Sequence, residues 1–286
     1  MTTFKNLTTI LSMLFCLLFS VTASSQSVNA SKNYITRNVP TTEFDAIKLM
    51  GSPKIIYTQS TNGKTSVQIY GSDNLVDLLE TKVTGRTLVV RFKNKPNIIS
   101  FGKNGRLQVI VSSPSIHSAT LEGSGDLVLK GNIQTTDLNL KLSGSGDIKV
   151  ENISANTGNI QLKGSGDIST QSCHINNLKI GLSGSGDVKI IGIKSTTASA
   201  SLQGSGDMEL TGTAQTAIIE LNSSGDIKAS GLQAKNVTAT VKGSGEISCY
   251  ATETLKATIK GSGDIDYKGN PKLKKSIAGS GTVSKK

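Results

Sequence analysis

Apolar and polar residues alternate over long stretches of this chain, and from about residue 118 the alternation recurs every 18 to 21 residues. Each repeat contains the tetrapeptide Gly-Ser-Gly-Asp or a close variant, and we call its fourth residue the mark. The marks are Asp126, Asp147, Asp167, Asp187, Asp207, Asp226, Glu246, Asp264 and Thr282. Positions −5 and +1 from the mark are apolar in all nine repeats, and positions −7 and +3 are mostly apolar. Apolar residues two apart, with polar residues between them, indicate β-strands rather than helices.

The repeats predict an all-β fold, a parallel β-helix (β-solenoid) with coils of about 20 residues. Each coil has one strand before a Gly-Ser-Gly bend, one strand after it, and a looser third segment near position +6. A single unit cannot bury its inner face alone, so successive units must stack on one another. A propeller blade needs about 40 residues, whereas a trimeric or sandwich arrangement is left open. Glycine suits the bend because it accepts positive φ and the close approach of another backbone.

Residues 31–122 are less regular but still strand-like. The segment 47–57 resembles one repeat, because Leu49 falls at position −5 and Lys54 at the mark. Alternating runs at 66–70, 87–92 and 107–111 predict strands, and 73–80 predicts a short helix. We expect degenerate coils and a cap over 31–122 that protects the exposed edge of the regular solenoid at 123–286. Residues 31–286 then form one continuous domain, and a separate small domain ending near 112–120 is the alternative.

The N-terminal segment 1–25 has the features of a secretory signal peptide. Lys5 is followed by an apolar stretch from Ile10 to Val21 and then by small residues at 22–25. The apolar stretch is shorter than the roughly 20 residues of a comfortable membrane span, and an uncleaved anchor is the alternative. No later segment is apolar enough to span a membrane. We expect an exported protein of the periplasm, the outer-membrane surface or the extracellular space.

Two cysteines, Cys173 and Cys249, remain after the predicted signal peptide and stand 76 residues apart. This separation is close to four coils, and strands stack about 4.8 Å apart, so the two residues are expected to lie roughly 19 Å from each other. A disulfide needs Cα atoms within about 7 Å. The sequence therefore predicts two free, buried thiols.

The formal net charge of +11 limits which classes of binding partner are expected. A basic surface favours anionic glycans, lipopolysaccharide or nucleic acid, but export makes nucleic acid an unexpected partner. The lysines are spread over many repeats, so a solvated basic surface is the simpler interpretation. We expect a glycan or an envelope or surface protein as the partner, no cofactor and no metal, and we leave an oligomer open.

The acidic marks form the one column that is a candidate ligand-facing site. Its members are Asp126, Asp147, Asp167, Asp187, Asp207, Asp226, Glu246 and Asp264. Stacked carboxylates about 4.8 Å apart repel one another. Turn N–H groups could offset the repulsion, as in Asx-turns, and so could Ca²⁺ or lysines at +2 and −4 (Lys149, Lys189, Lys228, Lys163, Lys242 and Lys260). We prefer a structural role for this column.

No catalytic residues are predicted, and we expect a protein that is not an enzyme. The histidines are His117 and His174, and the repeats contain only two aromatic residues, Tyr250 and Tyr267. His174 follows Cys173, but Cys173 falls in an inward column and is expected in the core. We therefore expect an exported, non-enzymatic binding, adhesin-like or scaffolding protein of the cell envelope. A polysaccharide-active β-helix enzyme, by analogy of fold alone, and a periplasmic sensor or signalling protein are the alternatives.

Several segments from about Arg37 onward resemble one known bacterial family. They are Phe44-Asp45-Ala46-Ile47, GSDNLVDLLETKV at 71–83, the TLVVRF and LQVIVSS strands, and the GSGD tetrapeptides. The family is named "putative auto-transporter adhesin, head GIN domain" and is found mainly in Bacteroidetes-like bacteria. The resemblance implies a right-handed β-helix. The family has no established catalytic or binding residues, so the resemblance assigns none here.

Overall fold

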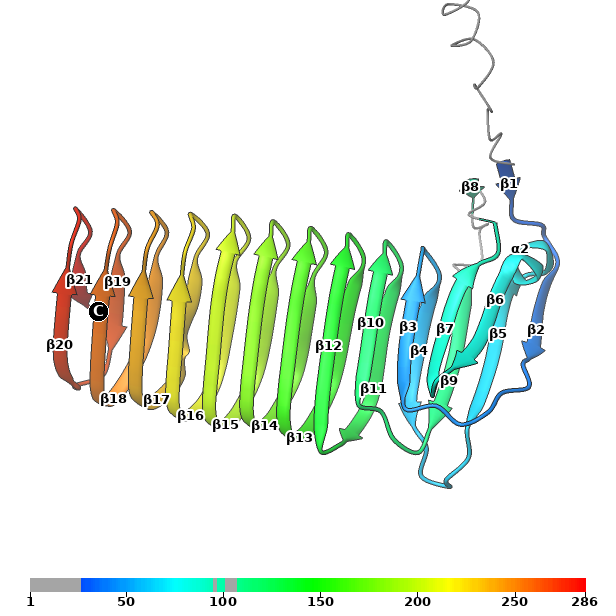
Figure 1. Ribbon diagram of the computed structural model, residues 1–286, viewed down its shortest axis with the longest axis horizontal. Coiled ribbons are helices and arrows are strands. Elements are labelled where there is room, and N and C mark those ends of the chain that lie inside the picture. Colours follow the sequence, from blue (N-terminus) through cyan, green and yellow to red (C-terminus); the bar gives the residue numbers. More distant parts are fainter. Residues whose placement is uncertain (1–26, 95–96, 101–106) are drawn as a thin grey trace, which may run out of the picture.

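Stacked parallel strands make up most of the computed structural model, which describes residues 27–94, 97–100 and 107–286. The chain is nearly all β-structure and winds into a solenoid of about 8 turns, so the expected fold is confirmed (Figure 1). No helix in the described ranges is long and apolar enough to cross a membrane. The predicted signal peptide at 1–25 lies outside the described residues.

The elements fall into an N-terminal group and a solenoid group. The N-terminal group is β1 (Ser27–Asn29), β2 (Tyr34–Asn38), β3 (Ala46–Met50), β4 (Lys54–Gln59), β5 (Ser66–Ser72), α2 (Asp73–Leu78), β6 (Leu79–Thr84), β7 (Thr87–Phe92), β8 (Asn97–Ser100) and β9 (Gln108–Ser113). The solenoid group is β10 (Ser118–Gly123), β11 (Asp126–Gln134), β12 (Asp137–Gly144), β13 (Asp147–Gly164), β14 (Ile168–Gly184), β15 (Val188–Gly204), β16 (Met208–Leu221), β17 (Ile227–Val241), β18 (Ile247–Ile259), β19 (Ile265–Lys268), β20 (Lys272–Ile277) and β21 (Val283–Lys285).

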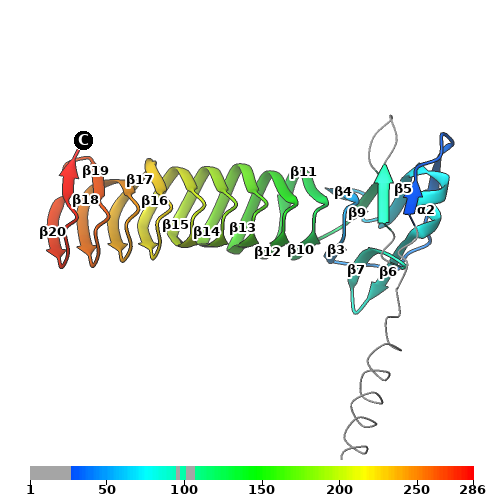
Figure 2. The ribbon, with the colours of Figure 1, turned by 90° about the horizontal axis from the view of Figure 1, so that it is seen from above.

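Each column of the sequence stacks on itself. Leu162 pairs with Leu142 on one side and with Leu182 on the other, and Ile148 pairs with Ile168, always in parallel register. The strands before the bends form one sheet, which we call the pre-bend sheet, and those after the bends form the post-bend sheet. Strands β13 to β18 are long because each starts in the post-bend sheet and ends in the pre-bend sheet of the next coil (Figure 2).

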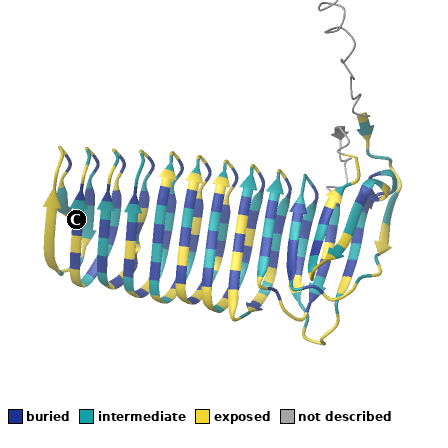
Figure 3. Cartoon of the chain, in the orientation of Figure 1, coloured by how far each residue is buried: buried dark blue, intermediate teal, exposed yellow. Residues whose placement is uncertain are grey.

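The core lies between the two sheets and follows the predicted alternation (Figure 3). Positions −5 and +1 are at most 2% exposed in the first eight repeats. The ninth repeat differs, because Lys275 and Lys285 occupy the inward positions −7 and +3. Ile277 at position −5 is 41% exposed there. Inward charges of this kind oppose the addition of another strand at a sheet edge.

The bends depend on glycine for two different reasons. The first glycine has positive φ in several repeats, as at Gly144 with φ 142°. The second has no positive φ at Gly146, but a Cβ there would lie 1.9 Å from the carbonyl oxygen of Gly125 in the preceding coil. The bends run along one edge of the row of coils, at the top of Figure 1. Glycine therefore sets how closely successive coils approach along that edge.

The N-terminal region continues both sheets and then ends them. Strand β10 pairs with β3 so that Leu121 faces Leu49, and β11 pairs with β4 so that Asp126 faces Lys54, as the sequence predicts. Beyond β3 and β4 lie β7 and β9, followed by antiparallel pairs with β6 and β5. The expected strands and the short helix are present, and α2 buries Leu75 and Val76.

The two thiols are free and buried, as predicted. Cys173 and Cys249 are 0% and 1% exposed. Burial raises the pKa of each thiol to about 12, so neither is a nucleophile near neutral pH. His174 is exposed, with its Nε2 3.4 Å from the Ser172 hydroxyl. Cys173 packs in the core, as expected.

We predict that Gly146→Ala lowers the melting temperature because its Cβ would collide with the Gly125 carbonyl oxygen. Overpacking of this kind typically costs about 1–3 kcal/mol. Thermal unfolding followed by circular dichroism measures the effect. Ser145→Ala is the matched control in the same bend, since Ser145 is exposed and its change should stay within about 0.5 kcal/mol. Equal melting temperatures for the two variants would contradict this role of Gly146.

Candidate functional site

The acidic marks stack along the bend edge, where most of their carboxylates accept a hydrogen bond from the backbone of the next coil. The N–H groups of Asp187, Asp207 and Asp226 donate to Oδ1 of the preceding mark at 3.0, 2.9 and 3.1 Å. The Glu246 N–H donates to Asp226 at 2.9 Å, and the Thr282 N–H donates to Asp264 at 2.6 Å. These acceptors bridge successive coils, whereas an Asx-turn would keep the bond within one turn.

These bonds spread the negative charge over the backbone dipoles of the next coil. A hydrogen bond to a carboxylate favours its ionised form. The pKa of Asp264 is accordingly lowered by the hydroxyl and then by the N–H of Thr282. The pKa of Asp207 is lowered first by Lys228 and then by the Asp226 N–H.

The lysines at +2 pair with acids, but two of the three reach a neighbouring coil. Lys149 lies 3.3 Å from its own Asp147, whereas Lys228 lies 2.6 Å from Asp207 of the preceding coil. Lys189 lies 2.7 Å from Glu209 of the following coil. Among the described residues, no ion pair involves the lysines at −4, which are Lys163, Lys242 and Lys260. The expected charge compensation from position −4 is therefore absent.

The far end of the acidic column contains a close pair of acids. Burial, and then the neighbouring Asp266 carboxylate, raises the pKa of Glu246. Glu246 and Asp266 line one pocket together with Lys286. Lys286 lies 3.0 Å from Asp266 and offsets its charge. Within the described part of the chain, no group of three or more His, Cys, Asp or Glu residues could hold a metal ion.

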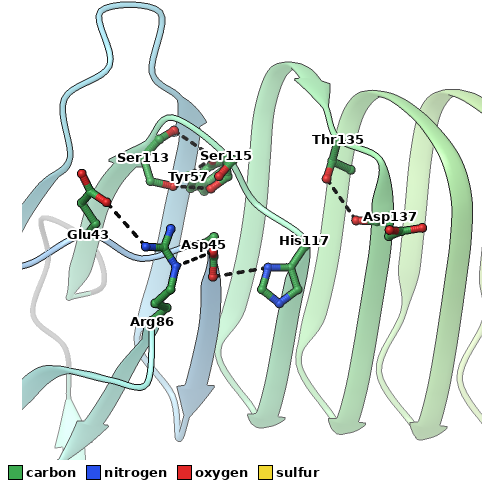
Figure 4. A network of polar contacts seen from close by, with 9 residues as sticks. All are labelled: Glu43, Asp45, Tyr57, Arg86, Ser113, Ser115, His117, Thr135 and Asp137. Atoms are coloured by element: carbon green, nitrogen blue, oxygen red, sulfur yellow. Dashed lines mark hydrogen bonds and ion pairs between the residues drawn. The ribbon is translucent and has the colours of Figure 1, made fainter.

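A second polar network joins the N-terminal region to the first regular coil (Figure 4). The Asp45 carboxylate accepts a 2.7 Å hydrogen bond from Arg86 and lies 3.3 Å from Nδ1 of His117. The His117 N–H also donates to the Asp45 carbonyl oxygen at 2.8 Å. The sequence does not predict this network, because Asp45, Arg86 and His117 lie in three separate loops, each directly before a strand. His117 thus connects the two regions through Asp45.

Tyr57 completes this junction inside the core. It is 0% exposed, and its hydroxyl donates to the Ser113 carbonyl oxygen at 3.1 Å. Burial raises the pKa of Tyr57, although the hydrogen bond with Ser113 opposes the shift. A buried tyrosine with a bonded hydroxyl is a structural residue.

Most of the chain matches one known protein family. The model described as "Putative auto-transporter adhesin, head GIN domain" matches residues 43–211 and 159–271. The chain belongs to this family. No curated protein matches the chain.

Several solved structures resemble nearly all of this chain. One described as a "putative adhesin" from Bacteroides fragilis is 29% identical, with a TM-score of 0.54, over 91% of this chain and 100% of that chain. One described as a "Putative lipid binding protein" from Parabacteroides distasonis is 28% identical, with a TM-score of 0.67 and the same coverage. Another "putative adhesin" from Parabacteroides distasonis is 21% identical with a TM-score of 0.71, over the same shares of both chains, and shows the fold alone.

The family and these solved structures fit a non-enzymatic binding role, and the adhesin descriptions suggest a surface or exported protein. Most acidic marks of this member accept a bond between coils through one carboxylate oxygen. From β12 onward, the outward lysines of the pre-bend sheet have no ion pair among the described residues, whereas Lys48 in β3 pairs with Glu122.

We predict that the melting temperature of this head GIN protein falls as the pH drops from about 5 to about 3. Asp207 and Asp264 have pKa values below the ordinary value of about 3.9. Their contribution is therefore present above that value and is lost as the pH falls through the folded-state pKa. Asp207→Asn and Lys228→Gln should each reduce the slope of melting temperature against pH, because both remove the same ion pair. An unchanged slope in both variants would contradict this assignment.

Proposed function

We propose that this chain is an exported, non-enzymatic β-solenoid protein with a binding, adhesin-like or scaffolding role in the cell envelope. The observation that carries the proposal is the regular outer surface, on which outward positions repeat from coil to coil in strict register. Strands stack about 4.8 Å apart, so weak contacts recur at a fixed spacing. Such contacts sum to avidity on a repetitive partner. The adhesin descriptions of the family and of the similar solved structures support the proposal.

The side chains that could do chemistry support binding over catalysis. Most carboxylates of the marks accept backbone N–H bonds, and Asp266 beside Glu246 is paired with Lys286. His117 lies in the junction network, and the His174 ring is hydrogen-bonded to the Ser172 hydroxyl. This distribution disfavours the alternative of a polysaccharide-active enzyme.

The remaining assignments belong to the same proposal. The proposed partner is a glycan or an envelope or surface protein, met after export to the periplasm, the outer-membrane surface or the medium. Residues 31–286 act as one domain, because both sheets run without a break from β3 and β4 into the regular coils. The solved relative described as a lipid binding protein adds anionic vesicles to the ligands to be tried.

We predict that the purified protein binds one or more polymers on a glycan array, or isolated cell envelopes, without releasing products. Surface plasmon resonance measures binding, and chromatography of the incubated polymer detects turnover. The thermally unfolded protein is the control for nonspecific adsorption. Release of oligosaccharides would favour the enzyme alternative, and no binding to any array polymer or envelope preparation would refute the proposed function.

We also predict that calcium produces no saturable heat when it is titrated into the protein. Ca²⁺ needs six to eight oxygen ligands, and one oxygen of most marks already accepts an N–H bond between coils. Isothermal titration calorimetry tests this directly. Saturable heat that disappears in Asp187→Ala would show instead that the acidic column is a calcium site.

A further inference from the structure

Lysines on the outer face of the pre-bend sheet differ from those of the post-bend sheet. Four post-bend lysines, Lys149, Lys189, Lys228 and Lys286, have an acidic partner within 3.3 Å. From β12 onward, the lysines at the outward positions −8, −6 and −4 have no ion pair among the described residues. They are Lys141, Lys163, Lys179, Lys242, Lys256, Lys260 and Lys274. Glu220 is the only acid at these positions, all of which are described, so this face is basic and uncompensated.

This basic face is hollowed at Gly181, on the pre-bend part of β14. The hollow has a volume of about 280 Å³ and is lined by Gln161, Lys163, Lys179, Ser183, Ser201 and Gln203. A second hollow of about 430 Å³ shares Lys179 and extends past Asn159 to Asn139. The two together make a furrow across β12 to β15, and Asp137 and His117 line the end of it that lies away from Gly181.

The fold does not require a glycine at position 181. Gly181 has no positive φ, and the three atoms nearest to a Cβ there belong to the side-chain amide of Gln161, which is flexible. The same position carries Lys141, Gln161 and Ser201 in the neighbouring coils. Glycine weakens a strand interior and often marks a place where a ligand approaches the backbone closely. We therefore read Gly181 as the floor of a binding site.

The walls of the furrow are held in place by side-chain amides. Gln161 Nε2 donates to Asn159 Oδ1 at 3.0 Å, and Asn159 Nδ2 donates to Asn139 Oδ1 at 3.2 Å. Amide groups can both donate to and accept from hydroxyl groups. Together with Lys163 and Lys179, they offer cations and hydroxyl-binding groups side by side. A polymer that carries both carboxylates and many hydroxyls matches this surface.

We propose that the outer face of the pre-bend sheet, centred on Gly181, binds a linear acidic polysaccharide. Its carboxylates meet Lys163 and Lys179, and its hydroxyls meet Gln161 and Gln203. This inference rests on the proposed binding function and names the class of ligand and its place. An anionic membrane is disfavoured, because Ile218 is the only large exposed apolar side chain on this face from β12 to β18, and interfacial binding needs buried apolar area.

The test measures binding of the protein to polygalacturonate and alginate, with neutral dextran as a comparison. The wild-type protein should bind the two polyuronates and not dextran, more weakly as salt rises. The double variant Lys163→Gln/Lys179→Gln should lose about tenfold or more in affinity, since each lysine makes a charge-assisted contact. Lys149→Gln/Lys189→Gln removes the same charge from the post-bend sheet and should change affinity less than about twofold.

The variant Gly181→Leu distinguishes the contribution of the furrow to binding from that of the lysine charges. It fills the hollow without changing any charge, so it should weaken polyuronate binding while its melting temperature stays at or above that of the wild type. Three results would each overturn the proposal. The first is an equal loss of polyuronate affinity in the two lysine double variants, and the second is wild-type affinity in Gly181→Leu. The third is binding of the wild type to anionic phosphatidylglycerol vesicles but to neither polyuronate. If array binding persists in Lys163→Gln/Lys179→Gln, only this inference fails, whereas absence of all binding by the wild type also refutes the proposed function.

Discussion

The close approach of one backbone to the next at the Gly-Ser-Gly bends is the contact on which the rest of the structure depends. A Cβ at the second glycine would lie about as close to the preceding carbonyl oxygen in every regular coil, for example 1.8 Å at Gly166 and 1.9 Å at Gly186. Because the bends nest in this way, the strands on either side stay in register and the apolar columns stack on themselves. The core is therefore narrow but continuous, which is how small aliphatic residues suffice to hold it together.

The same nesting divides the surface into parts with different roles. Along the bend edge, the carboxylates and the N–H groups of successive marks satisfy one another. On the post-bend sheet, lysines and acids pair across coils. The outer face of the pre-bend sheet has uncompensated lysines, a glycine that the fold does not need and a network of amides. A polymer that repeats along its length can meet several coils of this face at once.

The sequence predicts the fold well because the alternation of apolar and polar residues follows directly from which side chains are buried. Leu49, far from the regular repeats, is correctly assigned to its column by that logic. The contacts between coils could not be predicted, since they depend on which side chain reaches across the stack. Lys228 bonds Asp207 rather than its own Asp226 for this reason. The furrow could not be predicted either. In the sequence, Gly181 is one of several different residues at position −6, and only the structure shows Gln161 and Lys179 lining a hollow with it.

The central proposal is that the bend edge holds the coils together while the outer face of the pre-bend sheet binds the ligand. A crystal structure of the protein with a short oligogalacturonate tests this proposal most directly. We expect sugar density over Gly181, with carboxylates near Lys163 and Lys179 and the carboxylate bonds of the acidic marks undisturbed. Sugar density along the acidic marks, or over the paired lysines of the post-bend sheet, would contradict it.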